Sequence, residues 1–217
     1  MTQEPATRFA ILLDGALAPT DRLLRQMEGS RLLAADGGIR HAETLGREPE
    51  LWLGDFDSAG SALDKRFRHV PRAPYPRDKA VSDGQIAVRH ALEEGAREII
   101  FVGALGGDRS DHALFNLAGA SDLARAHPEV SVMLTSGREE AVPLLPGRPL
   151  RPDWPAGSVF SVVGFTPLSG LTVRNAKWPL EAVNVPFGST WTLSNVAGEG
   201  VEILLKDGCG MTICQLQ

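Results

Sequence analysis

The chain has 217 residues, enough to bury a sizeable core in one large domain or two small ones. Its 22 basic and 27 acidic residues give a net charge of −5, which argues against a broad nucleic-acid-binding surface. The N-terminus lacks an apolar signal core and no run of 18 apolar residues occurs, so we expect a cytoplasmic protein that does not associate with membranes. The two cysteines, Cys209 and Cys214, have no Cys or His neighbours at metal-binding spacing and are predicted to be small core residues of a reduced protein.

Short apolar runs alternate with helical patterns over the first two thirds of the chain. We predict strands at 9–13, 31–35, 51–53, 98–102 and 130–135, and a further extended piece at 67–70. Helices are predicted at 21–27, 39–45, 83–94 and 111–126, with Asp21 and Ser82 as N-caps and Gly46 and Gly95 as stops. This alternation predicts a Rossmann-like, mostly parallel sheet with helices on both faces. Ligands of such sheets bind beyond the carboxyl ends of the strands.

The composition changes near Pro143. Five prolines between 143 and 155 predict a stretch that is neither regular helix nor inner strand. Beyond it, short alternating runs at 158–163, 171–173, 190–193, 201–205 and 211–216 predict a small antiparallel β-sandwich or a partial barrel. We therefore expect an α/β domain at 1–144 and a β-sandwich domain at 145–217.

Two carboxylates, Asp55 and Asp57, follow the predicted strand at 51–53. Because side chains alternate along a strand, both carboxylates should point to the same side. They would repel one another unless a cation lay between them, and Mg²⁺ prefers oxygen ligands of this kind. An Asp-rich turn that caps the next helix is the alternative. The magnesium interpretation is favoured because other predicted strands also end in polar clusters, among them Asp36-Gly37-Gly38.

A glycine-rich stretch from Gly103 to Gly107 connects a predicted strand to a predicted helix. Glycines allow backbone N–H groups to approach phosphate oxygens, and the N-terminus of the following helix favours an anion. Arg109 offers a planar fork of donors suited to phosphate. Asp111 either caps the helix or binds a metal, and His112 is expected to pack or to support other side chains. At the earlier helix start, capping explains Ser82 but does not explain Asp83, although acidic residues are generally favourable in the first helical turn.

Taken together and in order, these segments resemble thiamine pyrophosphokinases from about Phe9 to the end of the chain. The resemblance rests on Ala35-Asp36-Gly37-Gly38, Gly54-Asp55-Phe56-Asp57-Ser58, Ser82-Asp83, Gly106-Gly107 with Arg109-Ser110-Asp111-His112 and Asn116, and Ser194-Asn195. It implies transfer of the pyrophosphoryl group of ATP to the hydroxyl of thiamine, giving thiamine diphosphate and AMP. It also implies a homodimer with active sites at the subunit interface.

The resemblance further implies roles for individual residues. The catalytic group would be Asp55, Asp57, Asp83 and Arg109, and the Mg²⁺ ligands Asp55, Asp57, Asp83 and Asp111. The ATP site would comprise Asp36, Gly37, Gly106, Gly107, Arg109, Asp111, His112 and Asn116. Ser194 and Asn195 would hold thiamine. The residue types leave open which of Asp55, Asp57 and Asp83 accepts the proton of the thiamine hydroxyl. Trp178 and Trp191 are candidate ring faces for the cationic thiazolium, although both also suit a β-domain core.

Three departures from the family pattern are visible. An Asp usual in the family is replaced by Ala80, an additional residue, Asp108, follows Gly107, and Val196-Ala197 stands where some relatives carry an aromatic ring. Three alternatives therefore stay open: a related pyrophosphokinase acting on a pterin alcohol, a non-catalytic thiamine- or nucleotide-binding protein, and a structural α/β protein with fortuitous Asp turns.

Overall fold

The computed structural model describes residues 7–56, 60–74 and 81–216. The chain packs as two compact units, which are described separately. Unit 1 comprises Met1–Ala113 and Glu129–Gly137, and unit 2 comprises Leu114–Pro128 and Arg138–Gln217. The last boundary between the two units therefore falls after Gly137, whereas the change of composition from which the domain boundary was predicted begins at Pro143. Within the described residues, none of the helices is long and apolar enough to cross a membrane.

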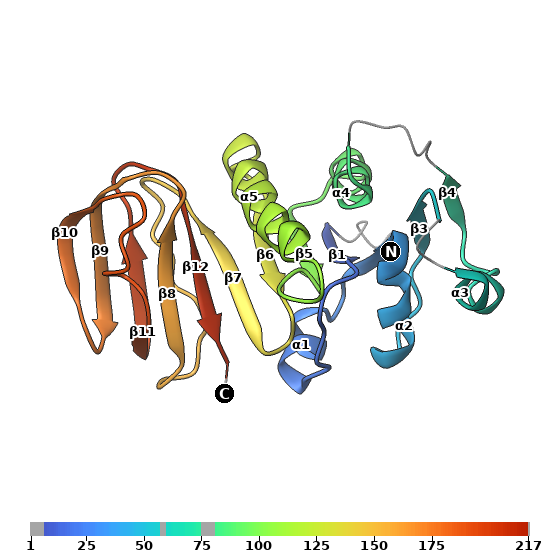
Figure 1. Ribbon diagram of the computed structural model, residues 1–217, viewed down its shortest axis with the longest axis horizontal. Coiled ribbons are helices and arrows are strands. Elements are labelled where there is room, and N and C mark those ends of the chain that lie inside the picture. The colour runs from blue at the N-terminus through green and yellow to red at the C-terminus, as the bar shows by residue number, and fades with distance from the viewer. Residues whose placement is uncertain (1–6, 57–59, 75–80, 217) are drawn as a thin grey trace, which may run out of the picture. The chain divides into compact units, whose positions relative to one another are not determined.

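Parallel strands form the centre of unit 1, in the order β6-β5-β1-β2-β3-β4 (Figure 1). Their bounds are β1 Arg8–Leu12, β2 Arg31–Ala35, β3 Leu51–Gly54, β4 Arg72–Pro74, β5 Glu98–Val102 and β6 Ser131–Thr135. The inner strands are continuous apolar runs because both of their faces are covered, as in Phe9–Leu12, where every side chain is buried.

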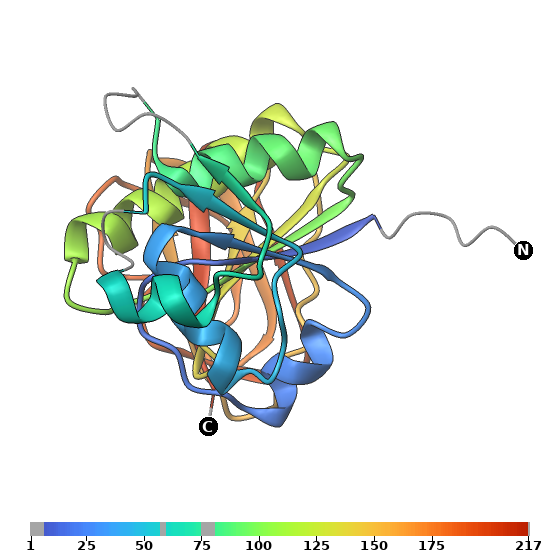
Figure 2. The ribbon, with the colours of Figure 1, turned by 90° about the vertical axis from the view of Figure 1, so that its right-hand side faces the viewer.

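Helices cover both faces of these strands. Their bounds are α1 Asp21–Gln26, the 3-10 helix η1 Asp36–Arg40, α2 His41–Thr44, α3 Gly60–Arg66 and α4 Asp83–Glu93. Leu23 of α1 and Ala42 of α2 pack with Ala10 and Leu12 of β1 in one apolar cluster. In the view of Figure 2, α4 lies above the strands and α1 and α2 lie below. The apolar face of α4, made by Ile86, Ala87 and Ala91, is buried.

The sequence predicted most of unit 1, with three corrections. Helix α1 has Thr20 as its N-cap, since the Thr20 hydroxyl accepts the Leu23 N–H at 3.2 Å, so the prediction of Asp21 was wrong. The extended piece expected at 67–70 is wrong, because α3 ends at Arg66, the next residues form a turn, and the strand that follows is β4. The helix predicted at 39–45 begins earlier, because the 3-10 helix η1 occupies Asp36–Arg40 directly after β2. Ser82 does cap α4, in a capping box with Gln85.

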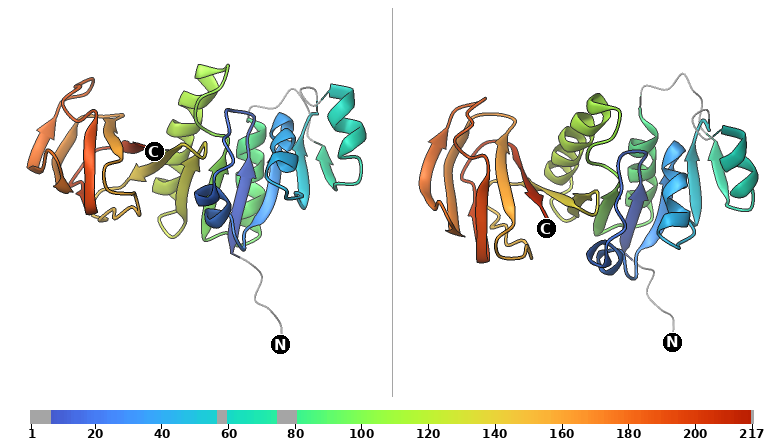
Figure 3. Two further views of the ribbon diagram at one scale, coloured as in Figure 1. Left: turned by 90° about the horizontal axis from the view of Figure 1, so that it is seen from below. Right: turned by 60° about the horizontal axis from the view of Figure 1, so that its bottom comes forward.

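Antiparallel strands make up most of unit 2, in the order β10-β9-β11-β8-β12-β7 (Figure 3). Their bounds are β7 Glu139–Leu144, β8 Val159–Gly164, β9 Leu168–Ala176, β10 Leu180–Val185, β11 Asn195–Leu204 and β12 Gly210–Gln215. Unit 2 also contains most of the long helix α5, Ser110–Ala126. The expected combination of an α/β part with further antiparallel strands is confirmed.

The structure of unit 2 also corrects several predictions made from the sequence. Pro143 lies inside β7 and pairs with Met211 of β12, so the expectation that this proline interrupts regular structure was wrong. The run 190–193, expected to be a strand, is a turn in which Leu193 N–H donates to the Thr190 carbonyl at 3.2 Å. The sequence did not predict β10. Neither cysteine forms a disulfide; Cys214 is buried and Cys209 is half-buried.

Candidate functional site

In unit 1, the segments that follow β2 and β3 meet the start of α4. A methyl group added to Gly54, the last residue of β3, would lie 3.2 Å from Asp83 Oδ1 and 3.3 Å from Asp36 Cα. The missing side chain of Gly54 therefore allows Asp36 and Asp83 to approach the end of β3, directly before Asp55. All three aspartates are half-buried. The structure thus brings together acidic residues that are far apart in the sequence.

The two segments carrying these aspartates have an unusual backbone. Asp36 has a φ of 43° and Phe56, directly after Asp55, has a φ of 62°. This left-handed region is sparsely populated by residues other than glycine and costs about 1–3 kcal/mol per residue. Both residues stand next to acidic side chains of the candidate site, where such conformations tend to concentrate.

The acidic residues suit a metal bound together with a nucleotide. Among the described residues, no three His, Cys, Asp or Glu side chains are grouped so that they could hold a metal ion by themselves. Asp57 and Ala80 lie outside the described residues. Mg²⁺ is usually bound by one or two carboxylates while waters and substrate phosphates supply its other ligands. Asp55 and Asp83 fit that arrangement better than a closed protein cage.

The glycine-rich segment after β5 packs against the end of β1. A methyl group added to Gly15 would lie 2.4 Å from the Gly103 carbonyl oxygen and 3.0 Å from that of Gly106. Gly106 and Gly107 are exposed and have φ values of 69° and 102°, which favour glycine. This part of the backbone is therefore free of side chains and open to a ligand, as a phosphate-binding segment requires.

Arg109 and Asp111 form a bidentate ion pair with each other. Arg109 Nε donates to Asp111 Oδ1 at 2.9 Å and Arg109 Nη2 donates to Oδ2 at 2.7 Å. The hydrogen bonds from Arg109 hold the pKa of Asp111 well below its usual range. Both side chains are about two-thirds exposed, so water competes for the pair. The Asp111 carboxylate occupies the Nε–Nη2 side of the Arg109 guanidinium, so a phosphate that binds this side has to replace it. Further along α5, His112 is exposed and Asn116 is half-buried.

No sequence pattern indicated a role for Asp14, Arg40 and His41. Arg40 Nη2 donates to the Asp14 carbonyl at 2.7 Å and Arg40 Nε pairs with the Asp14 carboxylate at 2.8 Å. His41 Nε2 lies 3.0 Å from the Gly15 carbonyl, which can only accept, so Nε2 carries the proton. The pKa of His41 is lowered by burial and by the charge of Arg40. Arg40 and His41 thus hold the end of β1 against the glycine-rich segment.

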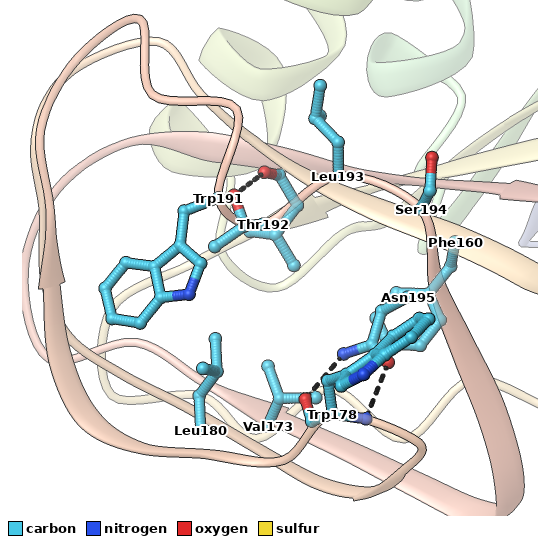
Figure 4. A pocket seen from close by; sticks show the side chains of 10 residues that line it. Phe160, Val173, Trp178, Leu180, Trp191, Thr192, Leu193, Ser194 and Asn195 are labelled. Carbon is cyan, nitrogen blue, oxygen red and sulfur yellow. Dashed lines mark hydrogen bonds between the residues drawn. The ribbon is translucent and has the colours of Figure 1, made fainter.

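Unit 2 contains a pocket of about 410 Å³. It is lined by Phe160, Val162, Val173, Trp178, Leu180, Trp191, Thr192, Leu193, Ser194 and Asn195. Figure 4 shows Trp178 and Trp191 on opposite sides of the pocket, with Leu180 and Val173 between them. Both tryptophans are more than half exposed. They are therefore pocket walls, and the reading of these two residues as core was wrong.

Ser194 and Asn195 also line this pocket, but they differ in exposure and geometry. Asn195 is buried, and its amide is bonded to the backbone of Trp178 in both directions. Ser194 is exposed, has a φ of 57° and donates its backbone N–H to Ser161 Oγ at 3.0 Å. In Figure 4 the Ser194 hydroxyl points away from both indole rings. The two residues are therefore placed for different tasks.

A cation already lies against one of the indole rings. Lys177 Nζ is 4.6 Å from the centroid of the Trp178 ring. The negative face of an indole attracts cations, and tryptophan is the strongest of the aromatic residues in this respect. The pocket therefore combines apolar walls with an aromatic face that is suited to a positively charged heterocycle.

Comparisons with known proteins agree on one family. A family model described as the thiamin pyrophosphokinase catalytic domain matches residues 25–133, and one described as the thiamin pyrophosphokinase vitamin B1 binding domain matches residues 151–209. No curated protein matches the sequence.

Solved structures with the same fold cover nearly the whole chain. A thiamine pyrophosphokinase from Bacillus subtilis is 22% identical with a TM-score of 0.82, covering 97% of this chain and 99% of that one. The enzyme from Geobacillus thermodenitrificans is 25% identical with a TM-score of 0.76, covering 96% and 98%. The yeast enzyme is 14% identical with a TM-score of 0.76, covering 99% and 88%.

Proposed function

Because the chain belongs to the thiamin pyrophosphokinase family, we propose that unit 1 holds ATP and unit 2 holds thiamine while the pyrophosphoryl group of ATP is transferred to the thiamine hydroxyl. The products are thiamine diphosphate and AMP. The observation that carries the proposal is the pocket between Trp178 and Trp191, since its lining falls wholly within the matched vitamin B1 binding domain. Its indole faces suit the cationic thiazolium ring.

In unit 1, Asp55 and Asp83, together with Asp57, would hold Mg²⁺ against the triphosphate. Asp36 and Asp83 both lie close to Gly54, directly before Asp55. Bound Mg²⁺ supplies neutralisation of the charge on the phosphate oxygens. Gly106 and Gly107 offer backbone N–H groups to the phosphates. Arg109, released from Asp111, donates to the phosphate oxygens as charge moves towards the AMP leaving group. Asp111, once released, would be a further ligand for Mg²⁺, and His112 would support the nucleotide site.

The chain's contribution to the chemistry is positioning. The thiamine hydroxyl attacks the β-phosphorus in line, and one carboxylate among Asp55, Asp57 and Asp83 accepts its proton. In unit 2, Ser194 and Asn195 orient thiamine and the tryptophans hold its rings. We propose that 1–144 is the Rossmann-like ATP domain and 145–217 the thiamine domain, its strands forming a β-sandwich.

We further propose a cytoplasmic homodimer. Several large apolar side chains of unit 2 are exposed, namely Leu114, Phe115, Phe187, Trp191 and Leu193. Apolar surface of this kind is costly to leave in water and commonly marks an interface. Cys209 and Cys214 form no disulfide, which suits a reducing compartment.

A substrate panel tests the proposed function against the pterin alternative. The protein is incubated with ATP, Mg²⁺ and either thiamine or a hydroxymethyl pterin, and AMP is measured. We expect AMP to form with thiamine and not with the pterin. AMP formed only with the pterin would overturn the assignment of the substrate, and AMP formed with neither would overturn the catalytic assignment.

A further inference from the structure

One buried side chain connects the two strained segments of the acidic site. Trp52 of β3 is fully buried, and its indole Nε1 donates to the Asp36 carbonyl oxygen at 2.9 Å. The edge of the same indole meets the Phe56 ring, with centroids 5.0 Å apart and planes at 79°. Trp52 therefore contacts the backbone of Asp36 and the side chain of Phe56, the two residues other than glycine near the site that have a positive φ.

These two contacts oppose the tendency of each backbone to relax. A residue other than glycine keeps a left-handed conformation only where its surroundings determine it more strongly than local sterics do. The hydrogen bond fixes the Asp36 carbonyl, and therefore the direction of the peptide that carries the Asp36 side chain. The edge-to-face contact, a favoured aromatic geometry, fixes the Phe56 ring and so the residue after Asp55.

Arg72 closes the arrangement from β4. Its guanidinium carbon lies 4.5 Å from the Trp52 ring centroid and 5.2 Å from the Phe56 ring centroid. The guanidinium is itself held by Asp64, with Arg72 Nη1 3.0 Å from Asp64 Oδ1 and Nη2 donating to the Asp64 carbonyl at 3.2 Å. Arg72 thus contacts both rings and limits their movement away from each other.

We infer that Trp52 is a positioning residue that sets the Asp36 and Asp55 segments as one unit, and that it thereby determines the affinity of this site for the Mg²⁺–nucleotide complex. Trp52 is fully buried and acts only through these segments. The inference rests on the proposed function, since the ligand of the acidic residues comes from there.

The test compares two identical substitutions in the same chain. Trp52→Phe removes the indole N–H and replaces the indole with a smaller phenyl ring. Trp154→Phe makes the same change in the core of unit 2, where Trp154 is 5% exposed and donates Nε1–H to Glu140 Oε2 at 3.2 Å. The Kd for α,β-methylene-ATP with Mg²⁺ is measured by calorimetry, together with the KM for thiamine. Hydrogen exchange of the amides of 36–40 and 54–56 reports on the segments without any ligand.

We expect Trp52→Phe to raise the nucleotide Kd about five- to tenfold, the size expected for one buried hydrogen bond, and to leave the thiamine KM unchanged. Exchange at 36–40 and 54–56 should accelerate together. Trp154→Phe should change neither the nucleotide Kd nor this exchange. An unchanged Kd in Trp52→Phe, or an equal rise in both variants, would overturn the inference.

Two further arms keep the result decisive. If Trp52→Phe does not fold, Phe56→Leu replaces it, because it removes the edge-to-face contact at a half-buried position; normal Kd in that variant would overturn the inference. If the wild-type protein binds no Mg²⁺–nucleotide, the proposed function fails. Hydrogen exchange then still decides whether Trp52 couples the two segments, since unaltered exchange in Trp52→Phe would reject the coupling itself.

Discussion

The side chain of Asn195 holds the backbone of Trp178 from both directions. Asn195 Oδ1 accepts the Trp178 N–H at 3.1 Å, and Asn195 Nδ2 donates to the Trp178 carbonyl at 2.8 Å. Oδ1 also accepts the Val196 N–H at 2.8 Å, so both of its acceptor positions are used and one N–H of the amide remains. Asn195 therefore positions a wall of the pocket in unit 2 and has a single donor left for a ligand.

This geometry predicts the effect of Asn195→Ala. The variant loses the positioning of Trp178 and the remaining donor, so the KM for thiamine should rise a few-fold to about a hundredfold, for a loss of roughly 1–3 kcal/mol. The KM for ATP should stay nearly unchanged. Asn184→Ala is the matched control, because Asn184 Oδ1 also accepts from a backbone N–H, that of Gly170 at 3.1 Å, but does not line the pocket. A raised KM for ATP with normal use of thiamine would contradict the assignment of thiamine to unit 2.

The acidic residues of unit 1 are tested by removing one charge at a time. Asp55→Asn and Asp57→Asn should each lower kcat by orders of magnitude at saturating Mg²⁺, because each removes a charge that holds the metal–phosphate complex. Circular dichroism should show an unchanged fold. Asp21→Asn, at the start of α1, is the control and should keep full activity. Near-normal kcat in either site variant would reject the magnesium site.

Arg109→Ala should depress kcat more than it changes the KM for thiamine. Its contact with the phosphates strengthens as charge develops in the transition state, whereas thiamine binds elsewhere. Arg66→Ala provides the control, since Arg66 is an exposed arginine of unit 1 that is paired with Glu43. Steady-state kinetics with both substrates varied would separate the effects. A rise in the thiamine KM at constant kcat would contradict the assignment of Arg109 to the phosphates of ATP.

The buried His41 should make stability depend on pH. Its pKa lies below the ordinary value of 6.5, chiefly because of burial and also because of Arg40, while the Gly15 carbonyl and Asp14 oppose the shift. As the pH falls below 6.5, His41 is therefore protonated in the unfolded chain before it is protonated in the folded chain. The free energy of unfolding should be at its maximum above that pH and should decrease below it. In His41→Gln the amide can still donate to Gly15, so the difference in urea stability between pH 7.5 and 5.5 should shrink. An equal difference in both proteins would contradict the account.

The proposed homodimer is tested by adding charge to an exposed apolar position. Leu114 of α5 is 62% exposed, and Leu114→Glu should shift sedimentation towards the monomer and lower activity. Leu24→Glu, at a position of α1 that is 41% exposed, should leave both unchanged. A wild-type protein that sediments as a fully active monomer at assay concentration would refute the homodimer.

The sequence predicted those elements whose signals are local. Strand β2 was predicted with its observed bounds because a buried apolar run ends at Asp36. Helix α4 was predicted because Ser82 caps it and its apolar residues, now buried, recur at helical spacing. Helix α3 was missed because it is short and contributes only Leu63 to the apolar cluster of unit 1. The run 190–193 alternates like a strand, but hydrogen bonds turn it back, which places Trp191 at the pocket.

The same distinction between local and non-local signals applies to the site residues. The positions of Asp36 and Asp83 could be expected, since both follow or precede recognisable elements at the carboxyl edge of the strands. The hydrogen bonds by which Asn195 positions Trp178 could not be expected, because Trp178 is 17 residues away in the sequence and the bonds involve its backbone atoms. Likewise Arg40 and His41 act on Asp14 and Gly15 through contacts that only the folded chain creates.

The fate of the β-phosphate of ATP tests the central claim most directly. The protein is incubated with thiamine, Mg²⁺ and ATP that carries ³²P at the β position, and the products are separated. Transfer of the pyrophosphoryl group predicts that all transferred label appears in thiamine diphosphate and that the AMP formed is unlabelled. Label that remains in ADP, together with thiamine monophosphate as the product, would contradict the account and identify an ordinary kinase.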